Sequence, residues 1–439
     1  MQELKNLMLK FGIVGAGGAG FPSYAKLAEG ADLLLINGSE CEPLIYTDYV
    51  ILKNELSLVL SGISKILSDT KISGALICVK EHTAKRLGFE NGERLADKIT
   101  VKVLPNAYPI GDEISLIYEA TKRLVKPGKL PITVGVIVYN VETMYNLGRA
   151  TRFNEPVTEK WLTVGGDIEK PSVIKVPVGT KISDIFKSLN ISVGEGYTVL
   201  DGGPSMGKIV NPATYAVTKT TKAILVLPDS TQAIGTKKIN EKIATVRAET
   251  ACCQCTRCTD MCPRNLLGYP LEPHKMVRTA MGAAKVMPEM VLSATLCCGC
   301  GICESLACSQ GISPRAVIAN YKELLAKNKL RFDTPGEYNV KEERDYRIIP
   351  SNKWMSTLGV TRFDKVADFE NEKIDPQRVE ISLSAHIGKP SVSCVSDGDK
   401  VEKGDLIADA ADGLSLPQHA SITGTVTLSN GKIIIDRIR

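Results

Sequence analysis

The chain has 439 residues, of which 44% are hydrophobic, and its 54 basic and 49 acidic side chains give a net charge of +5. This composition is typical of a soluble globular protein of about three domains, and the basic excess is too small and too evenly spread to indicate nucleic-acid binding. No apolar run approaches the roughly 18 residues of a membrane span, and the stretch MQELKNLMLK lacks the apolar core of a signal peptide, so we expect a cytoplasmic protein with no membrane span of its own.

A glycine-rich loop, FGIVGAGGAGFP at residues 11–22, is the first motif of the chain. Gly15, Gly17 and Gly20 have the G-x-G-x-x-G spacing of a dinucleotide-binding turn, which in a Rossmann fold follows a full strand and opens a long helix. Here a helical pattern precedes the loop and leaves room only for a strand stub, and the helix that Pro22 can begin is short. A Rossmann turn is therefore disfavoured. By itself the motif fits a plain connecting loop as well as a loop that approaches a phosphate, a flavin or a nicotinamide.

Three polar segments follow further predicted elements in the first 150 residues. The segment NGSECEP ends a strand predicted over residues 31–37, YPIGDE opens a helix predicted over 112–124, and YNVET ends a strand and begins a helix. Ligands of α/β sheets bind at the carboxyl ends of strands, where the first and third segments lie. Taken singly, each segment also fits a structural role, as a helix cap at Asp112 or Asn140, or as solvated charge at Glu40 and Glu42.

The middle of the chain, from Trp161 onward, alternates short strands, a Gly-Thr turn and one helix in WLTVGGDIEKPSVIKVPVGTKISDIF. This pattern predicts a compact β-grasp module. The glycines of the later segment DGGPSMGKIV are typical of turns, and we assign no catalytic role to this part of the chain.

Ten of the 13 cysteines lie between Cys252 and Cys308. A reducing cytoplasm disfavours structural disulfides, so such a dense group indicates metal binding. The first run matches the C-x2-C-x2-C-x3-C-P run of bacterial ferredoxins, and the second repeats it with four residues before its last cysteine and no proline after it. The predicted metal ligands are Cys252, Cys255, Cys258, Cys262, Cys297, Cys300, Cys303 and Cys308.

Two metal chemistries compete for cysteines at this spacing. Zinc sites use two C-x2-C pairs, whereas each run here offers three closely spaced thiolates and a distant fourth, which predicts two [4Fe–4S] clusters. In two-cluster ferredoxins the fourth cysteine of each run serves the other cluster, and the spacing leaves open whether Cys262 and Cys308 are exchanged in this way. The residues between the runs, 272–290, are predicted to be helical.

The C-terminal segment places Gly-Asp turns between short strands and is similar to a barrel-sandwich hybrid, the lipoyl or biotinyl fold. A lipoyl carrier has a lysine at the tip of its hairpin, but the tip region DGLSLPQHA contains none. We therefore expect a docking or structural module and not a carrier.

The motifs taken together resemble a known family. GAGGAGFPSYAK, NGSECEP, YPIGDE and YNVET occur in the order and spacing of the FMN- and NADH-binding subunit of respiratory complex I. The whole chain is similar to the RnfC and microcompartment cobalamin-reductase family, and the C-terminal position of the hybrid module favours the cobalamin-reductase arrangement. The resemblance implies an α/β multidomain fold: a complex I flavin-subunit-like α/β domain at 1–155, an SLBB β-grasp domain with a connecting segment at 156–245, a helix-rich two-cluster ferredoxin-like domain at 246–330, and a linker with the barrel-sandwich hybrid at 331–439.

The resemblance also implies roles for individual residues. The cofactor-binding residues would be Gly15, Gly17, Gly18, Phe21, Lys26, Asn37, Glu40, Tyr108, Gly111, Asp112, Asn140 and Thr143. Glu42 and Glu113 would be the catalytic pair that holds the hydroxyls of NADH. Ala16 stands where complex I has arginine and Ser39 where it has aspartate, and these differences concern nucleotide affinity more than flavin affinity.

The implied function is that of an NADH:acceptor oxidoreductase, which passes electrons from NADH through FMN and two [4Fe–4S] clusters to a partner protein or to cobalamin. Such a chain would be a subunit of a larger complex, in the cytoplasm, at a membrane through its partners or within a bacterial microcompartment. The alternative is an electron-relay subunit of a larger redox complex, such as a methylenetetrahydrofolate reductase assembly, without an NADH site of its own.

Overall fold

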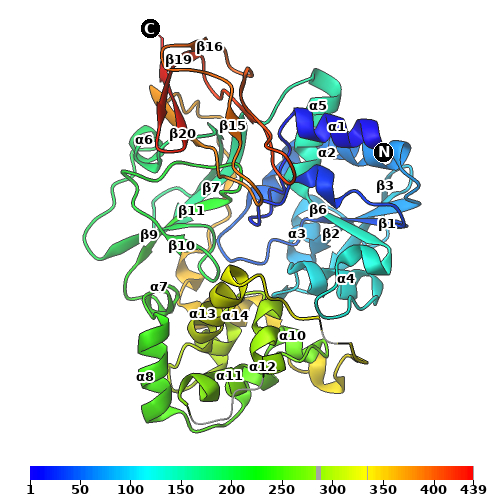
Figure 1. Cartoon of the computed structure of the whole chain (residues 1–439), viewed down its shortest axis with the longest axis vertical. Helices are drawn as coiled ribbons and strands as arrows, with labels where there is room; N and C mark the ends of the chain where they lie inside the picture. The colour runs from blue at the N-terminus through cyan, green and yellow to red at the C-terminus, as the bar shows by residue number, and fades with distance from the viewer. Residues whose placement is uncertain (283–287, 334, 439) are drawn as a thin grey trace.

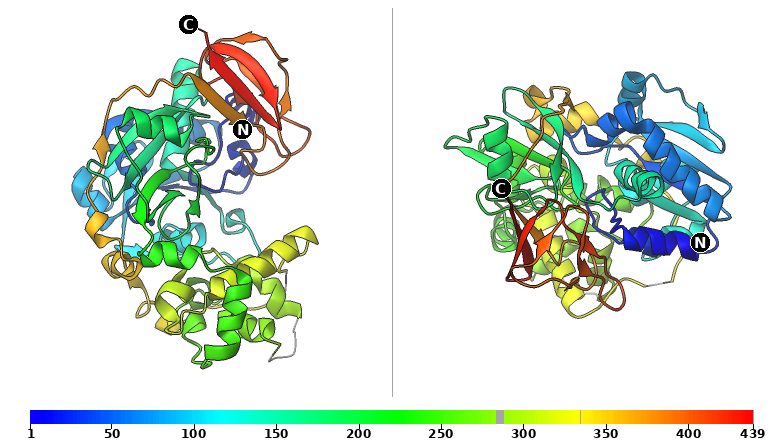
Figure 2. Two further views of the ribbon diagram at one scale, coloured as in Figure 1. Left: turned by 90° about the vertical axis from the view of Figure 1, so that its left-hand side faces the viewer. Right: turned by 90° about the horizontal axis from the view of Figure 1, so that it is seen from above.

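The computed structural model describes residues 1–282, 288–333 and 335–438, and Figure 1 shows four regions that follow one another along the chain. We call them the N-terminal region (1–155), the β-grasp region (156–239), the helical region (240–347) and the C-terminal region (370–438). In Figure 1 and in the left view of Figure 2, where the long axis is vertical, the helical region and the C-terminal region lie at opposite ends of the molecule. Among the described residues, no helix combines the length and apolar character that crossing a bilayer requires.

The N-terminal region is a sheet covered by helices on both faces. Its elements are α1 (Gln2–Lys10), β1 (Leu33–Asn37), α2 (Thr47–Asp69), β2 (Gly74–Lys80), α3 (Glu81–Leu87), β3 (Arg94–Ala96), β4 (Ile99–Leu104), β5 (Ala107–Tyr108), α4 (Glu113–Thr121), β6 (Val136–Asn140) and α5 (Val141–Phe153). The sheet has the order β3-β4-β2-β1-β6, and every neighbouring pair is parallel except β3 with β4.

The central strand β1 explains this layering. Successive strand side chains point to opposite faces: Leu34 and Ile36 pack with the side chains of α1, α2 and α5, whereas Leu35 packs with those of α4. A strand buried on both faces reads as a continuous apolar run, as LLLIN does. On the first face α2 and α5 lie so close that a Cβ at Gly148 would come within 2.1 Å of the Leu58 carbonyl oxygen.

The β-grasp region contributes a second sheet, in the order β10-β9-β11-β7-β8-β13. Its elements are β7 (Glu159–Gly166), β8 (Ser172–Pro177), α6 (Ile182–Ser188), β9 (Tyr197–Asp201), β10 (Lys208–Ile209), β11 (Ala223–Pro228) and α7 (Gln232–Lys237), with β13 (Asp368–Phe369) as an edge strand from later in the chain. Ile182, Ile185 and Phe186 of α6 pack with alternate side chains of β7, β8 and β11, which closes the core of this region.

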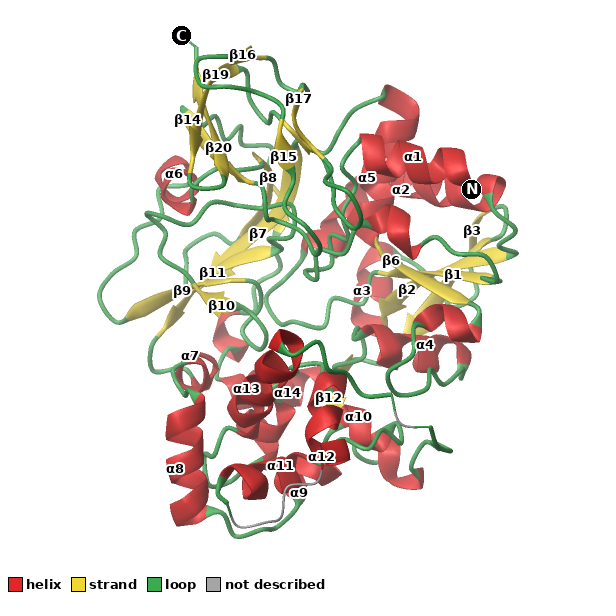
Figure 3. Ribbon diagram, viewed as in Figure 1, coloured by secondary structure: helices red, strands yellow, loops and turns green. Residues whose placement is uncertain are grey.

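The helical region contains no β-strand among its described residues, as Figure 3 shows. Its helices are α8 (Glu241–Ala251), α9 (Arg257–Asp260), α10 (Pro263–Leu266), α11 (Pro273–Ala280), α12 (Pro288–Leu292) and α13 (Pro314–Lys327). The chain then returns along the N-terminal region, where β12 (Ile349–Pro350) pairs with β5 and is followed by α14 (Ser351–Leu358).

The C-terminal region is built from two small antiparallel sheets, β14-β20-β19-β16 and β15-β17-β18. Its strands are β14 (Arg378–Ser382), β15 (Val392–Ser393), β16 (Lys400–Val401), β17 (Leu406–Asp409), β18 (Gln418–His419), β19 (Gly424–Ser429) and β20 (Lys432–Arg437). One buried cluster that includes Val379, Ile407 and Ile433 joins the two sheets, as expected of a barrel-sandwich hybrid.

Three predicted helices differ in length from the observed ones. The helix expected after Pro22 is only a 3-10 turn, Ser23–Lys26, because Leu27 turns to an extended conformation and enters the core. The helix predicted over 112–124 ends at Thr121, since Lys122 adopts a left-handed conformation. The helix predicted over 272–290 ends at Ala280, and residues 283–287 of that prediction lie outside the described part.

Candidate functional site

The glycine loop is a closed turn and not the start of a long helix. Val14 and Pro22 pair as an antiparallel bridge across it, and the Gly15 amide donates a hydrogen bond of 2.8 Å to the Phe21 carbonyl oxygen. Gly18 has a φ of +107°, and a Cβ there would meet nothing within 4 Å. The loop therefore presents backbone to open space, a geometry that allows a ligand to approach closely.

The carboxyl ends of β1 and β6 lie directly beneath this loop. Asn37 and Asn140 are paired residues of the two strands, and the Asn140 Nδ2 donates to the Asn37 carbonyl oxygen at 3.2 Å. The Asn37 side chain in turn donates through Nδ2 to the Gly111 carbonyl oxygen at 2.9 Å. The backbone N–H of Ala16 donates to Thr143 Oγ1 at 3.1 Å. Residues from all four N-terminal motifs thus meet at one edge of the sheet, where α/β folds bind ligands.

Gly111 shows how tightly these segments pack. A Cβ at this position would lie 2.5 Å from the Ser39 carbonyl oxygen and 2.8 Å from Cys41 Sγ, so only glycine fits. The Gly111 amide donates to that sulfur. The YPIGDE segment is therefore held against the end of β1 by its backbone.

Lys26 and Glu113 form an ion pair of 2.8 Å at this edge. Lys26 Nζ also donates to the Val138 carbonyl oxygen at 3.1 Å. Both side chains stay partly exposed, at 28% and 40%, and Phe21 is half-buried. These polar groups remain accessible to a ligand at the mouth of the loop.

Glu40, Glu42 and Tyr108 make their hydrogen bonds to segments other than the glycine loop. Glu40 accepts hydrogen bonds from the amides of Asp48 and Tyr49 in the first turn of α2, at 2.6 and 3.2 Å. Burial, together with the charge of Asp48, raises the pKa of Glu40 to about 8. This carboxyl group secures a helix N-terminus.

Glu42 and Tyr108 point toward the β-grasp and helical regions. Glu42 accepts from the Ser205 amide at 2.8 Å, and burial raises its pKa. The Tyr108 hydroxyl donates to the Cys300 carbonyl oxygen at 2.6 Å, and its ring stacks on Trp354 with centroids 4.5 Å apart. The proposed contacts of Glu40, Glu42 and Tyr108 with flavin or nucleotide stay predictions, as do the other residue roles.

A buried charge network supports the strand ends, and sequence reasoning missed its lysines. Lys222 Nζ lies 2.5 Å from Asp48 Oδ1 and donates to Asn140 Oδ1 at 3.4 Å. Lys160 Nζ forms an ion pair with Glu142, and both side chains are 1% exposed. The only sequence signal was a lysine inside each of two otherwise apolar segments, KWLTVGG and KAILVLP.

The C-terminal region covers the outer side of the glycine loop. The Ile387 amide donates to the Gly20 carbonyl oxygen at 2.9 Å. The fully buried Lys219 donates to the carbonyl oxygens of Gly12 and Pro417, both at 3.2 Å, and burial lowers its pKa to about 7. A cleft of about 450 Å³ opens between the loop, the β-grasp region and the C-terminal region. It is lined by Gly18, Gly20, Lys208, Tyr215, His386 and Lys432 among others.

The cysteines of the helical region fall into two groups that cross the two sequence runs. A small cavity is lined by Cys262, Cys297, Cys300 and Cys303 together with Cys298. Burial, and then the neighbouring thiols of Cys308, Cys255 and Cys252, raise the pKa of Cys258 to about 12.

The structure thus groups the last cysteine of each run with the first three of the other run. Cys262 packs in one hydrophobic cluster with Cys297, whereas Cys252 and Cys308 share another. No group of three or more His, Cys, Asp or Glu side chains among the described residues is arranged to hold a single metal ion. The thiols of Cys262, Cys297, Cys300 and Cys303 line one shared cavity, an arrangement that fits a [4Fe–4S] cluster.

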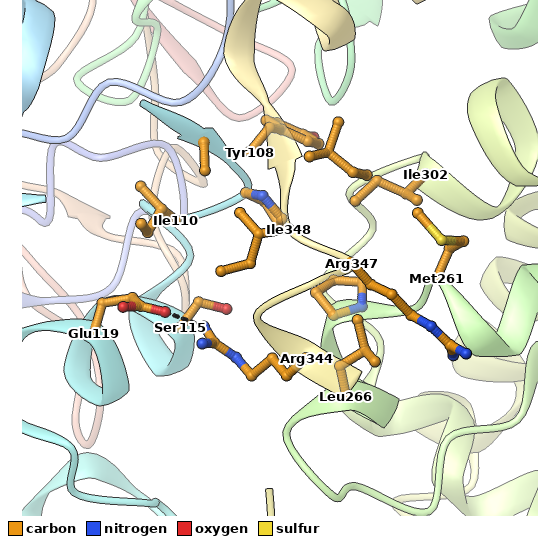
Figure 4. Close-up of a pocket in the computed structure, with 14 residues that line it drawn as sticks. Tyr108, Ile110, Ser115, Glu119, Met261, Leu266, Ile302, Arg344, Arg347 and Ile348 are labelled. Carbon is orange, nitrogen blue, oxygen red and sulfur yellow. Dashed lines mark hydrogen bonds and ion pairs between the residues drawn. The ribbon is translucent and has the colours of Figure 1, made fainter. Parts of the chain in front are cut away.

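A second cavity lies where the N-terminal region meets the helical region (Figure 4). It is small, and its walls include Tyr108 and Ile110 on one side and Met261 and Ile302 on the other. The ion pair of Glu119 with Arg344, dashed in Figure 4, closes one end. Nearby, Arg264 Nη2 donates to Asp112 Oδ1 at 2.8 Å. Because Arg264 follows Cys262 and Pro263 in the chain, this bond links the YPIGDE segment to the end of the first cysteine run.

The two positions that depart from complex I are both buried. Ala16 is 1% exposed, and Ser39 is 2% exposed and donates to the Cys78 carbonyl oxygen at 3.1 Å. Both side chains pack in the interior of the N-terminal region, so neither blocks the loop backbone or the Lys26–Glu113 pair from a ligand.

Comparisons with known proteins agree with this arrangement. The family model described as the Nuo51 FMN-binding domain matches residues 8–149, a 4Fe-4S dicluster domain matches 251–313, and the RnfC barrel sandwich hybrid domain matches 367–431. Cobalamin reductase PduS of Salmonella typhimurium is 35% identical over 427 residues, which cover 97% of this chain and 94% of that protein. The Citrobacter freundii protein of the same name is 34% identical over 428 residues, with the same coverage.

More distant similarities extend over part of the chain or concern the fold. A subunit of the ion-translocating oxidoreductase complex of Haemophilus influenzae is 30% identical over 275 residues, which cover 62% of this chain and 41% of that protein. Among solved structures, an NAD+-reducing [NiFe]-hydrogenase in the air-oxidized state has a TM-score of 0.46 at 19% identity, over 83% of this chain and 67% of that one.

Proposed function

Because this chain belongs to the family of the PduS cobalamin reductases, we propose that it oxidises NADH and delivers the electrons to a corrinoid. The chain is an oxidoreductase that depends on FMN and two [4Fe–4S] clusters, and this predicted cofactor set is confirmed by the family matches. The observation that carries the acceptor is the 35% identity to a cobalamin reductase over 97% of the chain, including the C-terminal region.

The residues at the sheet edge fit a bound flavin. The open face of Gly18, the backbone of the loop and the side chains of Asn37, Asn140 and Thr143 would surround its ribityl chain and phosphate. Backbone N–H groups and amides are the donors that phosphates accept from. The described cleft beside Gly18 and Gly20 supports this as the side from which NADH arrives.

Flavin and clusters supply complementary chemistry, since a flavin takes a hydride from a nicotinamide and gives up single electrons that iron–sulfur clusters carry. The protein orients the reactants and excludes water. Lys26 and Glu113 offer a cation and a carboxylate to NADH at the loop mouth. Tyr108 and Trp354 fill the space between the sheet edge and Cys300 with a stacked, buried pair of rings.

We infer that the chain works within a larger assembly. The matched proteins from Haemophilus influenzae are named as subunits of ion-translocating complexes, and those from Salmonella typhimurium and Citrobacter freundii as cobalamin reductases. Location in a bacterial microcompartment or at a membrane through partners stays a prediction.

The test is an anaerobic titration of the protein reconstituted with FMN, iron and sulfide. NADH should bleach the flavin and cluster absorbance, and added hydroxocobalamin should then be reduced and restore it. Lys26→Met should weaken NADH-dependent bleaching, because the cation at the loop mouth is lost. Lys53→Met is the matched control, since Lys53 makes an ion pair of 2.7 Å with Asp368 on an exposed surface.

Each outcome decides between defined alternatives. Bleaching by NADH without reduction of the corrinoid would refute the proposed acceptor and favour a partner protein. Bleaching by dithionite but not by NADH would replace the proposal with the electron-relay subunit.

A further inference from the structure

Arg264 is a buried arginine whose Nε–H has no hydrogen-bond partner among the described residues. It is 8% exposed, it follows Cys262 and Pro263 in the first turn of α10, and it lines the cavity of Cys297 and Cys300. Its Nη2 is paired with Asp112, but its Nε is buried and has no hydrogen-bond partner among the described residues. A buried donor without a partner is costly, so such groups point to an acceptor that completes the site.

The neighbouring Arg315 lacks this feature. It lines the same cavity, but its Nη2 lies 2.6 Å from Glu304 Oε1, and its Nη1 donates to the carbonyl oxygens of Ser205 and Gly299. Its charge is matched by a carboxylate that is 2% exposed. Arg315 is therefore a structural cation, whereas Arg264 lines the same cavity and keeps a buried N–H without a partner among the described residues.

The other group of cysteines lies in a different environment. Cys255 is exposed and the other three are half-buried, whereas Cys262, Cys300 and Cys303 are buried. The nearby Arg247 is exposed too, and its Nη1 donates to the Gly311 carbonyl oxygen. The two groups therefore differ both in burial and in the cation beside them.

We propose that Arg264 is a positioning residue for the cluster held by Cys262, Cys297, Cys300 and Cys303, that its Nε–H donates to a sulfur of that cluster, and that it raises the reduction potential of that cluster alone. The physical reason is that reduction adds negative charge, which a buried cation and a hydrogen bond to sulfur both stabilise. Through Nη2 the same side chain fixes Asp112, and with it the YPIGDE segment, to this cluster.

Asp112 makes the proposal testable in both directions. Its carboxylate offsets part of the charge of Arg264, so Asp112→Asn should raise the potential of the same cluster. Asparagine caps helices as well as aspartate does, and Asp112 caps α4 by accepting from the Ser115 amide. Arg264→Met should lower that potential. Arg247→Met is the matched control and should leave both potentials unchanged.

The measurement is a redox titration of the anaerobically reconstituted full chain, with the clusters followed by electron paramagnetic resonance and iron counted in every variant. Arg264→Met should change the ratio of reduced to oxidised cluster at least tenfold at a given potential, which is about 59 mV for one electron, while the other cluster keeps its value. Unchanged potentials in Arg264→Met at full iron content, or equal shifts of both clusters, would overturn the proposal.

If Arg264→Met assembles too little iron, Asp112→Asn decides alone. A higher potential for one cluster supports the role of Arg264, and unaltered potentials refute it. The inference rests on the two clusters and not on the acceptor. Because the titration uses a chemical reductant, failure of NADH or of the corrinoid would leave this test intact.

Discussion

Replacing Lys160 with methionine is expected to destabilise the N-terminal region strongly. The side chains of Lys160 and Glu142 are both 1% exposed, and Glu142 lies two residues after Asn140, the last residue of β6. Without Lys160, the Glu142 carboxylate keeps only the Trp161 amide at 3.2 Å and the more distant Lys222 at 3.8 Å. Breaking a buried ion pair by removing one partner typically costs 3–5 kcal/mol.

The remaining contact with Lys222 places the expected loss at the low end, at about 3 kcal/mol. For a region of this size each kcal/mol lowers Tm by roughly 2–4 °C, so Tm should fall by roughly 6–12 °C. The double variant Lys160→Met with Glu142→Gln should regain most of this, because no uncompensated charge stays buried and glutamine still accepts from the Trp161 amide.

Thermal release of FMN, followed by its fluorescence, would report on this region separately from the others, which is needed because a multidomain chain does not unfold in one step. Lys53→Met is the control, since its exposed ion pair should contribute at most about 1 kcal/mol. A fall in Tm below 2 °C for Lys160→Met would refute the reasoning, as would a double variant no more stable than the single one.

Three further predictions concern the clusters, a buried lysine and a helix contact. Cys308→Ala should remove the cluster held by Cys252, Cys255 and Cys258, and Cys262→Ala the cluster held by Cys297, Cys300 and Cys303. Each variant should keep about half the iron. If each variant instead lost the cluster of its own cysteine run, the exchanged grouping would be contradicted. Because the pKa of Lys219 is about 7 in the folded chain and 10.5 is its ordinary value, the folded state binds fewer protons between these limits. Wild-type stability should therefore rise from pH 7 to 9, relative to Lys219→Met, by up to about 1.4 kcal/mol per pH unit, and parallel Tm profiles would refute it. Gly148→Ala should cost about 1–3 kcal/mol, seen as a lower Tm, because its Cβ would meet the Leu58 carbonyl oxygen at 2.1 Å; an unchanged Tm would mean that α2 and α5 separate freely.

The sequence by itself determined the features that depend on local spacing. Three cysteines two residues apart can reach only one metal group, so the two runs predicted two clusters without any tertiary information. The strand stub and the short helix around the glycine loop disfavoured a Rossmann turn, and the closed turn between Val14 and Pro22 agrees. The apolar run within residues 31–37 likewise predicted a strand, which the structure shows as β1.

Only the tertiary structure decided which distant groups meet. Burial requires each charge and each donor to find a partner, and that partner is chosen by packing between regions and not by spacing along the chain. For this reason the sequence left undecided whether Cys262 and Cys308 each serve the cluster of the other run. The partners of Glu42 and Arg264 lie 163 and 152 residues away, so no local motif could reveal them.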